Sequence, residues 1–176
     1  TSYDFLPLIP MSQEMFSPGK SNQGRIAIDP IANNISVEEY CTNGHSATLT
    51  TNSNGFVNNT MYNQSSLYNG VSCRYKLNDT TYKLAGVNHA DSNGGDGTSY
   101  VSKHLFQKIT PIPFNTDYIK IVGDKQTSCS FKLYSGSSES FSLEGTNSVY
   151  DYRLSSRNKG VLTCNDPVMV VAQEAA

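Results

Sequence analysis

The C-terminal third of the chain alternates apolar and polar residues in consecutive short runs. Within residues 110–173, Cys129, Phe131 and Leu133 occupy every second position of one run, and a run of the same kind begins at Tyr150. Side chains two apart on a strand share a face, so this spacing predicts strands that bury one side. Gly, Ser and Asn residues after each run indicate turns. The pattern therefore restricts this part of the chain to a sheet with one buried face.

The last apolar run, Val168 to Ala172, shows no alternation. A run of this kind is typical of a strand that is covered on both faces, so we expect it to be central in its sheet. Pro167 stands at its start, where a proline removes no hydrogen bond from the ladder.

The first hundred residues predict a series of β-hairpins. Asn-Gly pairs at 43–44, 54–55 and 69–70 are typical of tight hairpin turns, and the runs between them have the length of strands. Residues 24–28 and 71–77 read as further strands. The whole chain is therefore expected to be all-β.

The fold class that we predict is an antiparallel β-sandwich-like domain stabilised by disulfides. A chain of 176 residues fits one domain. An internal repeat of 1–105 and 106–176 stays open, because CRYKLNDTTYKLAGV (from Cys73) is similar to VYDYRLSSRNKGVLTC (from Val149), and FLPLIPMSQ is similar to FQKITPIPF. The alternative is that amphipathic strands simply resemble one another.

The cysteines point to disulfides rather than to a metal. Their spacing contains no CxxC and no Cys/His zinc pattern, and an even number on strand-like segments favours two disulfides. Three pairings are open. The sequential pairing would close loops worth roughly 3–4 kcal/mol each in the loop-entropy model. The four residues are Cys41, Cys73, Cys129 and Cys164.

Disulfides imply an oxidising compartment, so we expect a secreted, extracellular protein. Four sequons would fit secretion, although a chain so rich in Asn, Ser and Thr contains such triplets by chance. The candidate glycosylation sites are Asn34, Asn58, Asn63 and Asn78.

Charge and hydropathy argue against two classes of partner. The net charge is -2 and no Lys/Arg cluster is present, whereas nucleic-acid binding depends on clustered positive charge. The longest apolar run is far shorter than the roughly 20 residues that span a bilayer. We therefore expect neither nucleic-acid binding nor membrane insertion.

The sequence offers little for catalysis or for a cofactor. The three histidines are dispersed, and neither HExxH nor GxSxG is present. One Gly-rich loop is similar to a calcium loop, but it lacks the Glu at the twelfth position of an EF-hand. Its weak candidate ligands are Asp91, Asn93 and Asp96. We expect no enzyme, no metal and no cofactor.

The C-terminal segments also resemble a known family. YIKIV, FKLYSGSSESFSL, VYDYRL and GVLTCNDPVMVVAQ follow one another in residues 109–173 as they do in the IgGFc-binding-protein type of extracellular module. FLPLIPMSQ and ITPIPFNTDYI resemble the proline-containing entry to such units. The Asn-rich segment 33–69 departs from the family pattern. The resemblance implies a β-rich, disulfide-containing, non-catalytic module of a large secreted glycoprotein.

Taken with the residues, this resemblance leads us to expect a structural, adhesion or binding module. Its partners would be other extracellular proteins, glycans or further copies of the same module. A carbohydrate-binding, lectin-like domain is the alternative, because exposed Tyr and Asn/Asp-rich loops can stack on sugars and hydrogen-bond to them. A secreted hydrolase is the least favoured class.

Overall fold

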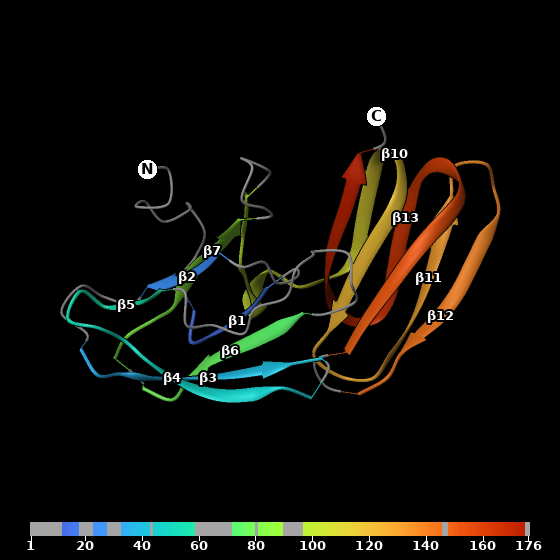
Figure 1. The fold of residues 1–176 in the computed structure, drawn as a ribbon. Coiled ribbons are helices and arrows are strands. Elements are labelled where there is room, and N and C mark those ends of the chain that lie inside the picture. The colour runs from blue at the N-terminus through green and yellow to red at the C-terminus, as the bar shows by residue number, and fades with distance from the viewer. Residues whose placement is uncertain are drawn as a thin grey trace. The chain divides into compact units, whose positions relative to one another are not determined.

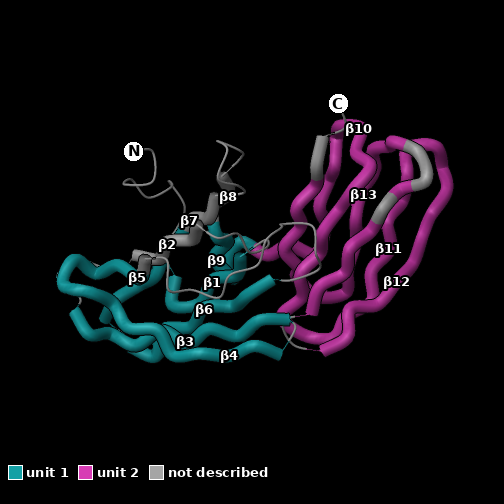
Figure 2. Tube along the Cα trace, viewed as in Figure 1, with its two compact units in different colours: residues 1–105 teal, residues 106–176 magenta. Residues whose placement is uncertain are grey.

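The computed structural model describes residues 12–17, 23–27, 33–42, 44–58, 72–79, 81–89, 97–145 and 148–174. The chain forms two compact units, Thr1–Leu105 and Phe106–Ala176 (Figure 2). Within the described residues every regular element is a strand, apart from the short 3-10 helix η1, Lys103–Leu105. None of the described residues form a helix that is long and apolar enough to cross a membrane. The all-β class is confirmed.

The described strands of unit 1 form two antiparallel sheets (Figure 1). One sheet has the order β4-β3-β6-β1-β9 and the other has the order β5-β2-β7-β8. The strands are β1 (Glu14–Phe16), β2 (Gln23–Ala27), β3 (Ser36–Cys41), β4 (Ser46–Thr50), β5 (Phe56–Asn58), β6 (Cys73–Leu77), β7 (Ala85–His89), β8 (Gly97–Ser99) and β9 (Val101–Ser102).

Unit 2 contains two strands that are long enough to serve both layers of a sandwich (Figure 1). Its strands are β10 (Gln107–Gly123), β11 (Thr127–Leu133), β12 (Ser138–Leu143) and β13 (Ser148–Glu174). Residues 109–112 of β10 pair with 160–163 of β13, whereas 116–123 pair with both 148–153 and 168–174. In each segment the residue number on β13 falls as that on β10 rises, so the paired segments run in opposite directions.

The two units share one order of neighbouring strands. In unit 1 the first sheet contains β4-β3-β6-β1. Its counterpart in unit 2 is β12, β11, then 160–164 and 109–112. The second sheet, β5-β2-β7, corresponds to 148–153, 116–123 and 168–174. The structure thus contains two related β-units.

This correspondence corrects the sequence comparison that suggested the repeat. The similarity between the segments that begin at Cys73 and Val149 aligns β6 with residues 149–154 of β13. By position in the sheet, β6 corresponds instead to 160–164. The reason is that β6 pairs with β3 and 160–164 pair with β11, and β3 and β11 occupy the same place in the order of their sheets. Amphipathic strands of different position share one pattern, so that pattern alone does not give the register.

Every paired segment of unit 2 contributes to the core between the two layers. Cys129 and Phe131 are buried and Leu133 packs against them, while Lys132 on the opposite face of β11 is exposed, as the alternation predicts. The buried core residues are Ile112, Ile119, Ile121, Cys129, Phe131, Leu143, Tyr152, Leu162, Cys164 and Val168.

The run from Val168 to Ala172 is less central than its composition predicts. Val168 and Met169 are both buried, although they point to opposite faces, but Val170 and the two residues after it are only partly buried. Among the described residues, 168–174 pair with β10 alone, and 116–123 form the strand with a neighbour on each side. The expectation of a central final strand is therefore wrong.

Both disulfides form, in the sequential pairing. Cys41 lies directly opposite Cys73 on β3 and β6, and Cys129 lies directly opposite Cys164 on β11 and β13; each pair has a Cα–Cα distance of 4.0 Å. The β3–β6 pair of unit 1 corresponds to the pair of β11 with 160–164 in unit 2, but the two disulfides lie at different positions along these pairs. The first joins the end of β3 to the start of β6, whereas the second lies near the start of β11.

Candidate functional site

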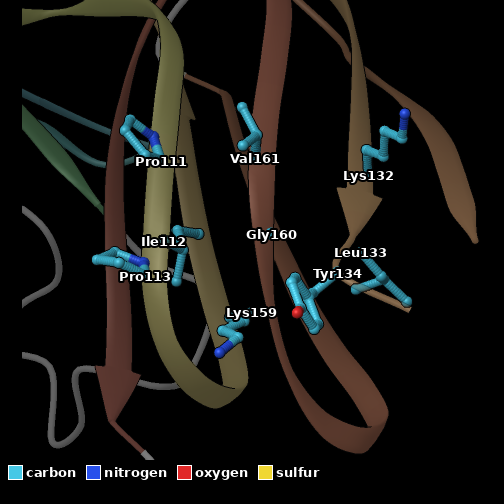
Figure 3. Close-up of a pocket in the computed structure, with 9 residues that line it drawn as sticks. All are labelled: Pro111, Ile112, Pro113, Lys132, Leu133, Tyr134, Lys159, Gly160 and Val161. Carbon is cyan, nitrogen blue, oxygen red and sulfur yellow. The ribbon is translucent and has the colours of Figure 1, made fainter. Parts of the chain in front are cut away.

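A pocket of about 440 Å³ lies in unit 2, where β10, β11 and β13 adjoin (Figure 3). In Figure 3 the two prolines lie on β10, and Tyr134 lies on the other side of the β13 segment that carries Val161. The lining residues are Pro111, Ile112, Pro113, Lys132, Leu133, Tyr134, Lys159, Gly160 and Val161.

The sheet places apolar side chains side by side on an exposed face. Pro111 pairs with Val161, and Val161 pairs with Lys132 on the next strand, so the three form a row across the layer. The segment of β10 that contains the two prolines is an edge strand among the described residues, where a residue without an N–H group is tolerated. Val161 is 41% exposed. This face therefore presents apolar surface to solvent.

Tyr134 is the most exposed large apolar side chain of the described residues, at 79%. Its backbone N–H donates to the Lys159 carbonyl at 2.8 Å, and the Lys159 ammonium lies 4.7 Å from the centre of its ring. Two backbone hydrogen bonds stabilise the turn that follows Tyr134. Leu133 N–H donates to Ser137 O, and Gly136 N–H donates to Leu133 O. The backbone and the cation–π contact thus hold the ring in place.

The lining of the pocket is apolar with a cationic component. Its only charged side chains are Lys132 and Lys159, and it contains no carboxylate, histidine, hydroxyl nucleophile other than the phenol of Tyr134, or thiol. Such a surface can stack against a ring or an apolar side chain and can attract an anionic group.

A cluster of buried polar side chains lies inside unit 1. Glu39 is fully buried, accepts a hydrogen bond of 2.6 Å from the Tyr75 hydroxyl, and lies 3.1 Å from Nε2 of His45. Tyr75 reaches the carboxylate because it stands opposite Glu39 in the register of β3 and β6. Its ring stacks on Tyr100 with centroids 5.4 Å apart. Burial raises the pKa of both phenols, and the Glu39 carboxylate raises them further.

A buried lysine is the third unusual group. Lys120, 1% exposed, lies 3.9 Å from the Asp151 carboxylate, which also accepts a hydrogen bond from the Tyr118 hydroxyl. Burial lowers the pKa of Lys120, and the Asp151 charge opposes that shift. The two residues face each other across neighbouring strands, so this contact ties the strands of one layer together.

The candidate glycosylation sites fall in different parts of the structure. Asn34 and Asn78 are exposed, and Asn58 ends β5. Outside the described residues lie Asn63 and the weak calcium candidates Asp91, Asn93 and Asp96.

Only one of the two residues that define the pocket, Tyr134, could be found from sequence pattern. Alternation in β11 places Tyr134 on the solvent face, beside the Ser/Gly turn that follows it. The partner Lys159 could not be found in this way, because the pairing of β11 with β13 that brings it to Tyr134 is long-range. Glu39 likewise reads as an ordinary strand residue.

Comparisons with protein-family models, with curated proteins and with solved structures yielded no match.

Proposed function

We propose that the chain is a non-catalytic binding or adhesion module of a larger secreted glycoprotein, and that it contacts its partner through the pocket at Tyr134. The observation that carries this proposal is an exposed aromatic ring, fixed by Lys159, in an apolar pocket of a disulfide-bonded sandwich. A fixed ring loses little conformational entropy on binding, which favours recognition.

Two further features support an extracellular binding role. Each unit contains one disulfide, which fits an oxidising compartment. The resemblance of residues 109–173 to IgGFc-binding-protein modules implies the same class of function. The partners would be extracellular proteins, glycans or further copies of the module, without nucleic acid or membrane insertion.

A carbohydrate ligand is the second candidate, and Tyr134 is the observation that favours it. An exposed phenol ring can stack on the apolar face of a sugar, and Lys159 beside it can pair with a sulfate or carboxylate group. Because the lining contains no carboxylate, a glycan bound here would need no calcium.

The test is a glycan array with neutral, sialylated and sulfated members, run beside sedimentation analysis of the chain alone. We expect binding in at least one assay, and we expect Tyr134→Ala to weaken it at least tenfold. Lys159→Ala should weaken binding of acidic ligands selectively.

Lys125→Ala is the matched control, because Lys125 is an exposed cation outside the pocket lining. Its binding should equal that of the parent chain. If binding survives Tyr134→Ala unchanged, the pocket is not the contact surface. Turnover of a glycan or ester substrate by the purified chain would contradict the non-catalytic assignment.

A further inference from the structure

The disulfide of unit 1 lies against a buried carboxylate. The Sγ atoms of Cys41 and Cys73 and a carboxylate oxygen of Glu39 all lie within 4.8 Å of one another, and all three residues are buried. The arrangement follows from the sheet: Glu39 and Cys41 are two apart on β3 and share a face, and Cys73 stands opposite Cys41 on β6.

His45 extends this cluster through the hairpin that follows β3. Gly44, in a left-handed conformation (φ 91°), turns the chain, and Cys41 N–H donates to the His45 carbonyl at 2.8 Å. His45 Nε2 then lies 3.1 Å from Oε1 of Glu39. Nitrogen and oxygen ligands of one tetrahedral zinc ion are about 3.3 Å apart, given bonds of about 2.0–2.2 Å.

We propose that reduction of the Cys41–Cys73 disulfide opens a metal site, with Glu39, Cys41 and Cys73 as ligands. His45 contacts Glu39 but lies outside the group of ligand atoms within 4.8 Å, so its side chain must shift toward the sulfur atoms to become the fourth ligand. Two equivalents of a thiol reductant break the S–S bond, giving two cysteine thiols and the oxidised disulfide of the reductant. Metal binding then releases the two thiol protons to solvent. Two thiolates with an imidazole and a carboxylate suit zinc.

The surroundings are already organised for such an ion. The Tyr75 hydroxyl donates to Oε2 of Glu39 and so fixes the carboxylate, as partners outside the ligand set do in metal sites.

The second disulfide provides an internal comparison. Cys129–Cys164 joins directly opposed residues at the same Cα–Cα distance of 4.0 Å. Its neighbours in the core are apolar, and no carboxylate or histidine of the described residues forms a ligand group with it. Reduction of this pair should therefore give two thiols without a metal site.

The test is cobalt(II) titration of the full chain after reduction with a phosphine under argon. We expect one equivalent to give the intense visible bands of tetrahedral cobalt with a thiolate charge-transfer band, and zinc to displace it. Oxidised protein should give neither. Near-ultraviolet circular dichroism of the same samples reports whether the bound state is folded.

Substitutions assign the ligands. Cys129→Ser with Cys164→Ser should leave the cobalt spectrum intact, whereas Cys41→Ser with Cys73→Ser should abolish it. Glu39→Gln and His45→Ala should each weaken affinity at least 10-fold, because loss of a ligand costs no less than loss of an outer partner, which costs about 10–100-fold. Equal loss in both cysteine pairs, or cobalt binding without a native near-ultraviolet spectrum, would show that an unfolded chain binds the metal and would overturn the proposal. Unchanged affinity in Glu39→Gln would overturn it too.

Discussion

Gly160 lies so close to Lys132 that a Cβ atom on Gly160 would be 2.2 Å from the Lys132 carbonyl oxygen and 3.1 Å from Leu133 Cα. These are backbone atoms of the neighbouring strand β11, so a flexible side chain cannot relieve the clash. The close approach of β11 and β13 beneath the pocket therefore requires glycine.

Gly160→Ala should lower the free energy of unfolding by about 1–3 kcal/mol, the usual effect of adding a methyl group to a tightly packed site. Urea denaturation measures it. Thr163→Ala is the control, since Thr163 is exposed on the same strand and its loss should cost less than about 0.5 kcal/mol. If both variants had the same free energy of unfolding, β11 and β13 could move apart at Gly160 without loss of stability, and glycine would not be required there.

Ile121→Asp should be far more damaging than Val170→Asp. Ile121 is fully buried on the strand that has a neighbour on each side, and a charge there would have no partner in the apolar core. Val170 is only partly buried, so its aspartate retains contact with water. We expect Ile121→Asp to abolish the cooperative urea transition and Val170→Asp to shift it. The reverse order would contradict the assignment of the central strand.

Thiol titration of the denatured, unreduced chain should find close to no thiol, because all four cysteines are paired. Replacement of Cys129 and Cys164 by Ala should then cost roughly 3–4 kcal/mol, as the loop-entropy model gives for a separation of 35 residues. Two or more thiols per chain in the first experiment would contradict the pairing.

Stability should fall at alkaline pH because of Tyr75 and Tyr100. Burial raises the pKa of both phenols in the folded state, so their contribution is complete below the ordinary value of 10.0 and is lost as pH rises above it. Absorbance of tyrosinate should show fewer ionised phenols in native than in urea-denatured protein at pH 11. In Tyr100→Phe the stability should decline less steeply above pH 10. An unchanged slope would remove Tyr100 as a cause.

Local pattern predicted the strands of this protein well, but it did not predict which strands become neighbours. The alternation of Cys129, Phe131 and Leu133 is set by the two-residue repeat of a strand, and the structure follows it. Lys120 shows the limit of that argument. It stands in an alternating run that would place it in water, yet it is 1% exposed and lies 3.9 Å from the Asp151 carboxylate. Burial depends on what covers a strand, and the alternation within the strand does not give that.

The candidate site was less predictable than the fold for the same reason. Tyr134 and Lys159 are 25 positions apart, and only the pairing of β11 with β13 brings them together. Glu39 and Cys73 meet through the β3–β6 pairing in the same way. A single sequence gives the residue types, but the long-range contacts that make a site come from the sheet.

The two disulfides also determine how the chain responds to a pulling force. Each disulfide carries tension directly from one cysteine to the other. The loop between the two cysteines, with a sequence separation of 32 or 35, therefore cannot extend. At about 3.4 Å for each residue, roughly 110 Å and 120 Å of contour length stay hidden in the two units. A chain pulled at its two ends would therefore lengthen only through its segments outside the two loops, while β4, β5, β12 and the Tyr134 turn remain shielded from the load.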